Sequence, residues 1–155
     1  MIISGFTGIG KSTIARLSRY NRIIDLESSD FFVNGNRIDK WYEIYCKIAK
    51  RLSDQGYIVF VSCHKDVRNY LKEHDIKYVV IYPSKELEAE WTLKLKHRYN
   101  KNQSESNLKA LQRVENNFLD DVNDIIKHDD LSIPIIEIDY ALEDYISEAI
   151  EMIDR

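Results

Sequence analysis

The sequence GFTGIGKS at residues 5–12 is the feature that most constrains the fold of this chain. It fits the pattern G-x-x-x-x-G-K-[ST] and stands between an apolar run at residues 1–4 and a stretch of helical period at residues 11–19. This pattern belongs to a loop that joins a buried strand to a helix. It therefore predicts that the chain begins with a strand, a tight glycine-rich turn and a helix.

The residue types in this loop also predict that it binds a polyphosphate. Glycines allow backbone N–H groups to turn toward phosphate oxygens, and the start of the following helix adds positive potential. Lys11 has the length to reach the β and γ phosphates, and Ser12 offers a hydroxyl to Mg²⁺. The expected nucleotide-binding residues are Gly5, Thr7, Gly8, Ile9, Gly10, Lys11, Ser12 and Thr13. The loop does not by itself name the reaction, because ATPases, GTPases and kinases all use it.

Apolar runs and stretches of helical period alternate along the rest of the chain. The alternation predicts strands at 22–26, 57–62, 78–82 and 133–139, and helices at 38–52, 65–74, 87–99, 111–126 and 142–153. Such an order is typical of an α/β fold with a five-stranded parallel sheet and helices on both faces. The run at 57–62 is continuously apolar, so we expect it to be a central strand beside the first one.

Three residues are expected to mark the ends of elements. Gly56 is placed to cap the helix before it, and Pro83 to stop the fourth strand. Ser84 is placed to cap the next helix.

Length, charge and cysteine content limit what the chain does. Its 155 residues fit one domain, 1–155, and 22 Lys and Arg against 26 Asp and Glu give a net charge of −4. Duplex nucleic acid is therefore not an expected partner, whereas a small anionic acceptor needs only a local positive charge. Cys46 and Cys63 fit neither a disulfide framework nor a zinc site. Without a signal peptide or a membrane span, we expect a cytoplasmic protein, and its oligomeric state stays open.

Two other classes of nucleotide-binding protein fit the sequence less well. Switch and motor proteins hold Mg²⁺ with an aspartate at the end of an apolar strand, but the strand at 57–62 leads into Cys63 and His64. The segment NKNQ at residues 100–103 lacks the carboxylate that would pair with guanine. Cys63 and His64 are not a nucleophilic pair either, because neighbours on a strand point to opposite faces.

The loop, the acidic turn DLESSD at residues 25–30, the small size and a late basic segment together resemble the P-loop kinases of nucleotides and small molecules. That group includes nucleoside monophosphate kinases, shikimate and gluconate kinases, and the kinase domain of phage polynucleotide kinase. The resemblance implies a three-layer P-loop NTPase fold with strand order 2-3-1-4-5. It also implies an acceptor-binding region at about 27–55 and a mobile basic lid at about 94–113.

The resemblance assigns roles to residues that follow the strands. Asp30 is the leading candidate to address the acceptor, Asp25 to contact Mg²⁺ together with Ser12, and Glu27 is a substitute for either. Arg98 and Lys94 would close over ATP, with Lys109 and Arg113 as secondary candidates. The expected acceptor-binding residues are Ser28, Ser29, Phe31, Phe32, Tyr42, His64, Lys65, Arg68 and Lys94. For many of these residues the competing interpretation is a turn, a core position or a solvated helix face.

The resulting hypothesis is an ATP- and Mg²⁺-dependent phosphotransferase in which Lys11, Asp30 and Arg98 act on the reacting groups. The expected acceptor is a nucleotide or nucleoside monophosphate. A polynucleotide 5′-hydroxyl or a small alcohol is the first alternative. A regulatory module that binds ATP or hydrolyses it slowly is the second.

Overall fold

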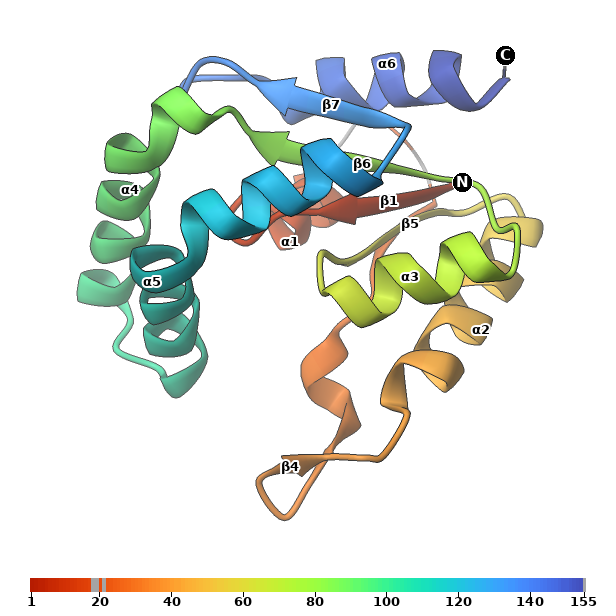
Figure 1. The fold of residues 1–155 in the computed structure, drawn as a ribbon, viewed down its shortest axis with the longest axis horizontal. Coiled ribbons are helices and arrows are strands. Elements are labelled where there is room, and N and C mark those ends of the chain that lie inside the picture. Colours follow the sequence, from red (N-terminus) through yellow and green to blue (C-terminus); the bar gives the residue numbers. More distant parts are fainter. Residues whose placement is uncertain (18–19, 21, 155) are drawn as a thin grey trace.

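The computed structural model describes residues 1–17, 20 and 22–154. Five parallel strands form one sheet with helices on both faces, which confirms the predicted α/β class (Figure 1). From edge to edge the strands are β2 (Ile23–Asp25), β5 (Ile58–Ser62), β1 (Ile2–Gly5), β6 (Tyr78–Pro83) and β7 (Ser132–Ile135). One face is covered by α1 (Lys11–Leu17) and α6 (Leu142–Asp154), and the other by α2 (Trp41–Asp54), α3 (Lys65–Glu73) and α5 (Glu105–His128).

The register of the central strands brings the functional segments to one edge of the sheet. Strand β1 lies between β5 and β6, so the expected neighbourhood of the first strand and the 57–62 run is confirmed. Gly5, at the end of β1, is paired with Ser62 of β5 and Ile81 of β6. Because the strands are parallel, the segments that follow β1, β2 and β5 all leave from this edge, where α/β proteins bind ligands.

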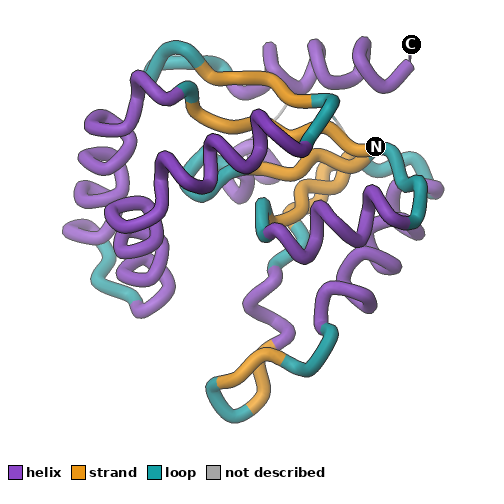
Figure 2. The backbone as a smooth tube through the Cα atoms, in the orientation of Figure 1, coloured by secondary structure: helices purple, strands orange, loops and turns teal. Residues whose placement is uncertain are grey.

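Between β2 and α2 the chain makes an excursion that the hydrophobic pattern does not predict. A 3-10 turn, η1 (Ser28–Phe31), leads into an antiparallel hairpin of β3 (Phe32–Val33) and β4 (Asn36–Arg37), which projects away from the sheet (Figures 1 and 2). Its turn residues Asn34 and Gly35 have φ of 52° and 80°, as a type I′ turn requires. Helix α2 consequently begins at Trp41 rather than at 38.

The later helices differ from the prediction mainly at their ends. Ser84 caps no long helix, because a 3-10 turn, η2 (Lys85–Leu87), separates it from α4 (Glu88–Lys101). Ser104 instead caps α5 by accepting a hydrogen bond from the Asn107 N–H. Strand β7 ends at Ile135, four residues before the predicted end, and Pro83 is the last residue of β6. No helix in the described part of the chain combines the length and apolar character needed to cross a bilayer.

Gly56 ends α2 in the way the sequence predicts. Its φ is 88°, its N–H donates to the Ser53 carbonyl, and the Tyr57 N–H donates to the Leu52 carbonyl. These two bonds define a Schellman motif, which needs a residue in the left-handed region. The motif turns the chain from α2 into β5.

We expect Gly56→Ala to lower the free energy of unfolding by about 1–2 kcal/mol, because a side chain makes the left-handed conformation unfavourable. Gln55→Ala is the matched control, since Gln55 has an ordinary φ of −84°. Urea unfolding followed by circular dichroism measures both. Equal stability of the two variants would show that the motif does not constrain this turn.

Candidate functional site

The loop formed by residues 5–12, called the glycine loop below, is fixed from outside by two side chains. The Trp91 indole of α4 donates to the Thr7 carbonyl at 2.8 Å, and the Tyr140 hydroxyl donates to the Ile9 carbonyl at 2.5 Å. The two aromatic rings are stacked with centroids 6.4 Å apart. Residues distant in sequence therefore hold the carbonyl side of this loop.

The backbone N–H groups of this loop and of the first residues of α1 are largely unpaired. Within the part of the chain that the structure describes, six N–H groups at and just after this loop donate to no backbone acceptor: those of Thr7, Gly8, Gly10, Lys11, Ser12 and Thr13. Unpaired backbone donors need water or a ligand, because leaving them unsatisfied is costly. The loop can thus accept an anion without breaking any existing hydrogen bond.

Close packing explains why glycine is needed here. A Cβ atom at Gly8 would lie 2.8 Å from Leu95 Cδ2, and the residue has a φ of 88°. A Cβ atom at Gly5 would lie 2.5 Å from Ile9 Cδ1. At Gly8 the positive φ disfavours any side chain, whereas at Gly5 a Cβ atom would require the flexible side chains of Ile9 and Lys11 to shift.

Charges of both signs act on Lys11. Its Nζ donates to the Gly5 carbonyl at 3.1 Å, so the side chain curls over the loop. Burial lowers the pKa of Lys11, while the negative charges of Asp25 and Glu27 oppose this shift and the positive charge of Arg98 adds to it. Charges of both signs thus act on the ammonium, from carboxylates after β2 and from a cation of α4.

The three acidic residues after β2, called the carboxylate cluster below, are Asp25, Glu27 and Asp30. Burial, the charge of Asp25 and a hydrogen bond between the two side chains raise the pKa of Glu27, and the charge of Asp30 acts in the same direction. The structure therefore brings together the three carboxylates that the sequence singles out. The charge of Lys11 opposes this rise in the pKa of Glu27.

A buried tyrosine fixes the position of this cluster. The Tyr45 hydroxyl donates to the Leu26 carbonyl at 2.6 Å and accepts from the Ser62 N–H at 2.8 Å. Tyr45 has no exposed surface. It therefore ties the segment after β2 to the end of β5.

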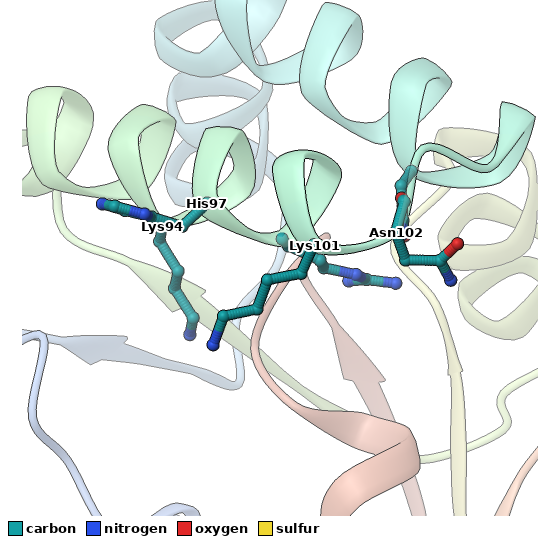
Figure 3. A pocket seen from close by; sticks show the side chains of 6 residues that line it. Lys94, His97, Lys101 and Asn102 are labelled. Carbon is teal, nitrogen blue, oxygen red and sulfur yellow. Dashed lines mark hydrogen bonds between the residues drawn. The ribbon is translucent and has the colours of Figure 1, made fainter.

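The inner side of the α4–α5 hairpin carries a cationic pocket of about 510 Å³ (Figure 3). Its lining residues are Lys94, His97, Arg98, Lys101, Asn102 and Asn107. Lys94 and Lys101 extend from α4 into the same space, and Lys94 Nζ lies 4.4 Å from the centre of the Trp91 ring. Burial and the nearby charge of Arg98 lower the pKa of Lys94. The expected cations of α4 therefore face a common space beside the residue that anchors the glycine loop.

Arg68 and Lys65 face a different part of the molecule from the one expected. Arg68 is only 4% exposed and forms ion pairs with Asp129 and, at 2.7 Å, with Asp124. Lys65 reaches the same Asp124 at 3.3 Å. Both cations are thus bound to carboxylates at the C-terminal end of α5, and Arg68 joins α3 to that helix.

Arg37, on β4, is the residue of this edge that sequence reasoning missed. Its guanidinium lies 4.3 Å from the Trp41 ring centre and 5.0 Å from that of Phe32. Its Nη1 contacts His64 Nε2 at 2.9 Å, and its Nη2 contacts Ser28 Oγ at 3.4 Å. The hairpin therefore folds back and brings a cation to His64, 27 residues further along the chain.

The remaining predicted acceptor residues divide into core and surface positions. Phe31 packs against Trp41 and Tyr45, and Tyr42 packs against Trp41 and Tyr70. Phe32 is 38% exposed on the hairpin. Ser29 and Asp30 are both exposed.

A magnesium site depends on more than the protein side chains. The described residues include no group of three or more His, Cys, Asp or Glu arranged to hold a metal ion. Mg²⁺ in nucleotide sites keeps waters and takes oxygens from the phosphates, so one hydroxyl such as that of Ser12 and one carboxylate such as Asp25 suffice. Ser12 follows Lys11 at the start of α1, and Asp25 is the last residue of β2.

Comparisons of the chain with protein-family models, with curated proteins and with solved structures found no match. The interpretation of the site therefore depends on its motif, its geometry and its charges.

Because Arg68 neutralises the buried Asp129, we expect Arg68→Ala to lower the free energy of unfolding by about 3–5 kcal/mol. Lys65→Ala is the control, because its side chain is 63% exposed and its ion pair contributes about 0–1 kcal/mol. Chemical denaturation of both variants checks this prediction. An Arg68→Ala protein of unchanged stability would contradict the structural role.

Proposed function

We propose that this chain is an ATP- and Mg²⁺-dependent phosphotransferase of the small P-loop kinase group, which transfers the γ-phosphoryl group of ATP to a nucleotide or nucleoside monophosphate. The observation that carries the proposal is the position of Lys11. It belongs to a loop with unpaired amides, and it is acted on by the negative charges of Asp25 and Glu27 and by the positive charge of Arg98. Phosphoryl transfer needs a cradle for the donor, a group that orients the acceptor and cations for the transferred charge.

The topology supports the same proposal. Numbered along the chain, the strands of the parallel sheet have the order 2-3-1-4-5, which the resemblance to these kinases implies. With helices on both faces, the arrangement fits a three-layer P-loop NTPase fold. The candidate residues come from segments that follow β1, β2, β5 and β6, at the edge where such sheets bind ligands.

Each part of the site has a proposed task. The loop amides and Lys11 bind the phosphates of ATP, and Ser12 and Asp25 help to hold Mg²⁺. Asp30 orients the acceptor. Arg98 and Lys94 stabilise the charge that develops on the transferred group. Trp91 keeps the two cations near the loop, since it joins α4 to the Thr7 carbonyl.

A module that only senses ATP would need the loop but no acceptor site. The carboxylate cluster and the cationic pocket beside Lys11 favour transfer over sensing. The two functions differ in a simple assay, because only a kinase forms a phosphorylated acceptor together with ADP.

We expect Lys11→Ala to weaken the binding of ATP with Mg²⁺ by about 100-fold, because it removes charge-assisted hydrogen bonds. Lys96→Ala, on the exposed outer side of α4, is the matched control and should bind normally. Titration calorimetry measures both. If the purified protein binds no purine nucleoside triphosphate, the proposal fails.

We expect Asp30→Asn to retain ATP binding and to lower the turnover of phosphoryl transfer about 100-fold or more. The assay uses labelled ATP with a panel of nucleotide, nucleoside, oligonucleotide and sugar acceptors. Asp54→Asn, at the exposed end of α2, is the control. Full transfer activity in Asp30→Asn would exclude Asp30 from the mechanism, and ATP binding without any acceptor product would favour the sensor.

A further inference from the structure

Helix α5 carries apolar side chains on a second face, beside the one that packs on the core. Leu119 and Ile126 are 42% and 50% exposed, and each follows a buried residue of the helix by one position. One position is a rotation of about 100° on a helix, so these two side chains share a face that the core does not use. In Figure 1 the C-terminal half of α5 lies on the near side of the sheet, and no other described element passes in front of it. The buried apolar residues of α5 are Leu111, Val114, Phe118, Val122 and Ile125.

Asn123 is the centre of this second face. Leu119 lies four residues before it and Ile126 three residues after it, and all three side chains are exposed. The exposed Asp120 and Lys127 lie on the adjoining flank of the helix, three residues before Asn123 and four residues after it. Neither forms an ion pair within the described residues. These five residues, called the Asn123 face below, combine an uncharged middle with one unpaired charge of each sign.

The Asn123 face is complementary to itself. When a second copy of α5 lies antiparallel to the first, with Asn123 on the two-fold axis, Leu119 of one copy meets Ile126 of the other and Asp120 meets Lys127. Symmetry repeats both contacts, which gives two apolar contacts and two ion pairs. An Asn–Asn pair at the axis fixes the register, as a polar residue does between paired helices. Parallel pairing would instead place Asp120 against Asp120, where like charges repel.

We propose that the Asn123 face is a dimer interface, through which two copies of this chain pair by antiparallel contact of their α5 helices. The inference goes beyond the proposed kinase function and does not depend on it. No residue of the Asn123 face lines the cationic pocket, so dimerisation and anion binding use different surfaces.

The size of the interface sets the expected affinity. Residues 116–130 span about 21 Å of helix, so the contact belongs to the small class of specific interfaces, below about 1,200 Å² in total. Interfaces of this class are weak and reversible. We therefore expect a Kd of about 10–100 µM for the dimer.

Sedimentation equilibrium over about 5–500 µM protein covers this range of Kd. The wild-type protein should show a reversible equilibrium of monomer and dimer. Ile126→Glu buries a charge against Leu119 of the other copy and should weaken the dimer at least about tenfold. Ile44→Glu is the matched control, because Ile44 on α2 is also 50% exposed. Circular dichroism checks that both variants are folded.

Three results of this experiment would overturn the inference. The first is a wild-type protein that stays monomeric at every concentration. The second is an equal loss of dimer in the two glutamate variants. The third is growth beyond a dimer, because a two-fold contact is closed.

Exchanging the two charges tests the register. Asp120→Lys alone and Lys127→Asp alone each bring like charges together at two symmetric places, so each should weaken the dimer about tenfold. The double variant restores opposite charges and should return the Kd to within about threefold of the wild-type value. Single variants that dimerise normally, or a double variant that does not recover, would contradict the proposed pairing.

Cysteine cross-linking tests the direction of the helices. Asn123→Cys should form a disulfide between two copies under mild oxidation, because this residue meets itself at the axis. Leu119→Cys and Ile126→Cys should cross-link when mixed but not alone, since each lies about 9–12 Å along the helix from its own equivalent and a disulfide cannot span this distance. The wild-type protein is the control for Cys46, which is buried, and Cys63. Self-linking of Leu119→Cys would show parallel pairing and exclude the proposed dimer.

ATP binding keeps this inference apart from the kinase proposal. Ile126→Glu should bind ATP with Mg²⁺ as the wild-type protein does, because Ile126 belongs to neither the glycine loop nor the cationic pocket. A wild-type protein that dimerises without binding a nucleotide would end the kinase proposal and leave the dimer established. A strict monomer that transfers phosphate would do the reverse.

Discussion

The two hydrogen bonds that Trp91 and Tyr140 donate to the carbonyls of the glycine loop are the constraint on which the site depends. A loop that binds phosphate must keep its amides free, although free amides in a compact protein tend to find internal acceptors. Occupying the Thr7 and Ile9 carbonyls from outside fixes the loop without using the amides. The same contacts fix α4 relative to Lys11, so the anchor of the loop also positions the cations of the neighbouring pocket.

Much of the fold could be predicted from the sequence because its signals are local. The apolar runs became strands, and Gly56 ended α2 through a motif that only its neighbours in sequence define. The hairpin after β2 was missed because its strands are only two residues long, too short for a hydrophobic period. A local signal was present, however: Asn34–Gly35 is a typical pair for a type I′ turn.

The site was predictable only where a motif specifies it. The glycine loop and the acidic residues after β2 follow from short-range patterns, whereas the partner of a cation is decided by the tertiary fold. Arg68 was predicted to bind the acceptor because its actual partner, Asp129, lies 61 residues away and no sequence pattern indicates that the two are paired. Arg37 was not predicted as a site residue, because nothing near it in the sequence indicates that it contacts His64. A lone arginine or histidine therefore carries little information until its neighbours in space are known.

The anchor at Trp91 lies near the beginning of α4, and Leu95, one turn later, is also buried. This end of the helix is the one that is tied to the glycine loop. Lys101 is ten residues beyond Trp91, or about 15 Å along the axis, so a tilt of about 10° would move it by roughly 3 Å. A displacement of this size separates contact with a bound anion from no contact at all. The distance of the distal cations from the glycine loop therefore depends on how α4 is held at Trp91 and Leu95.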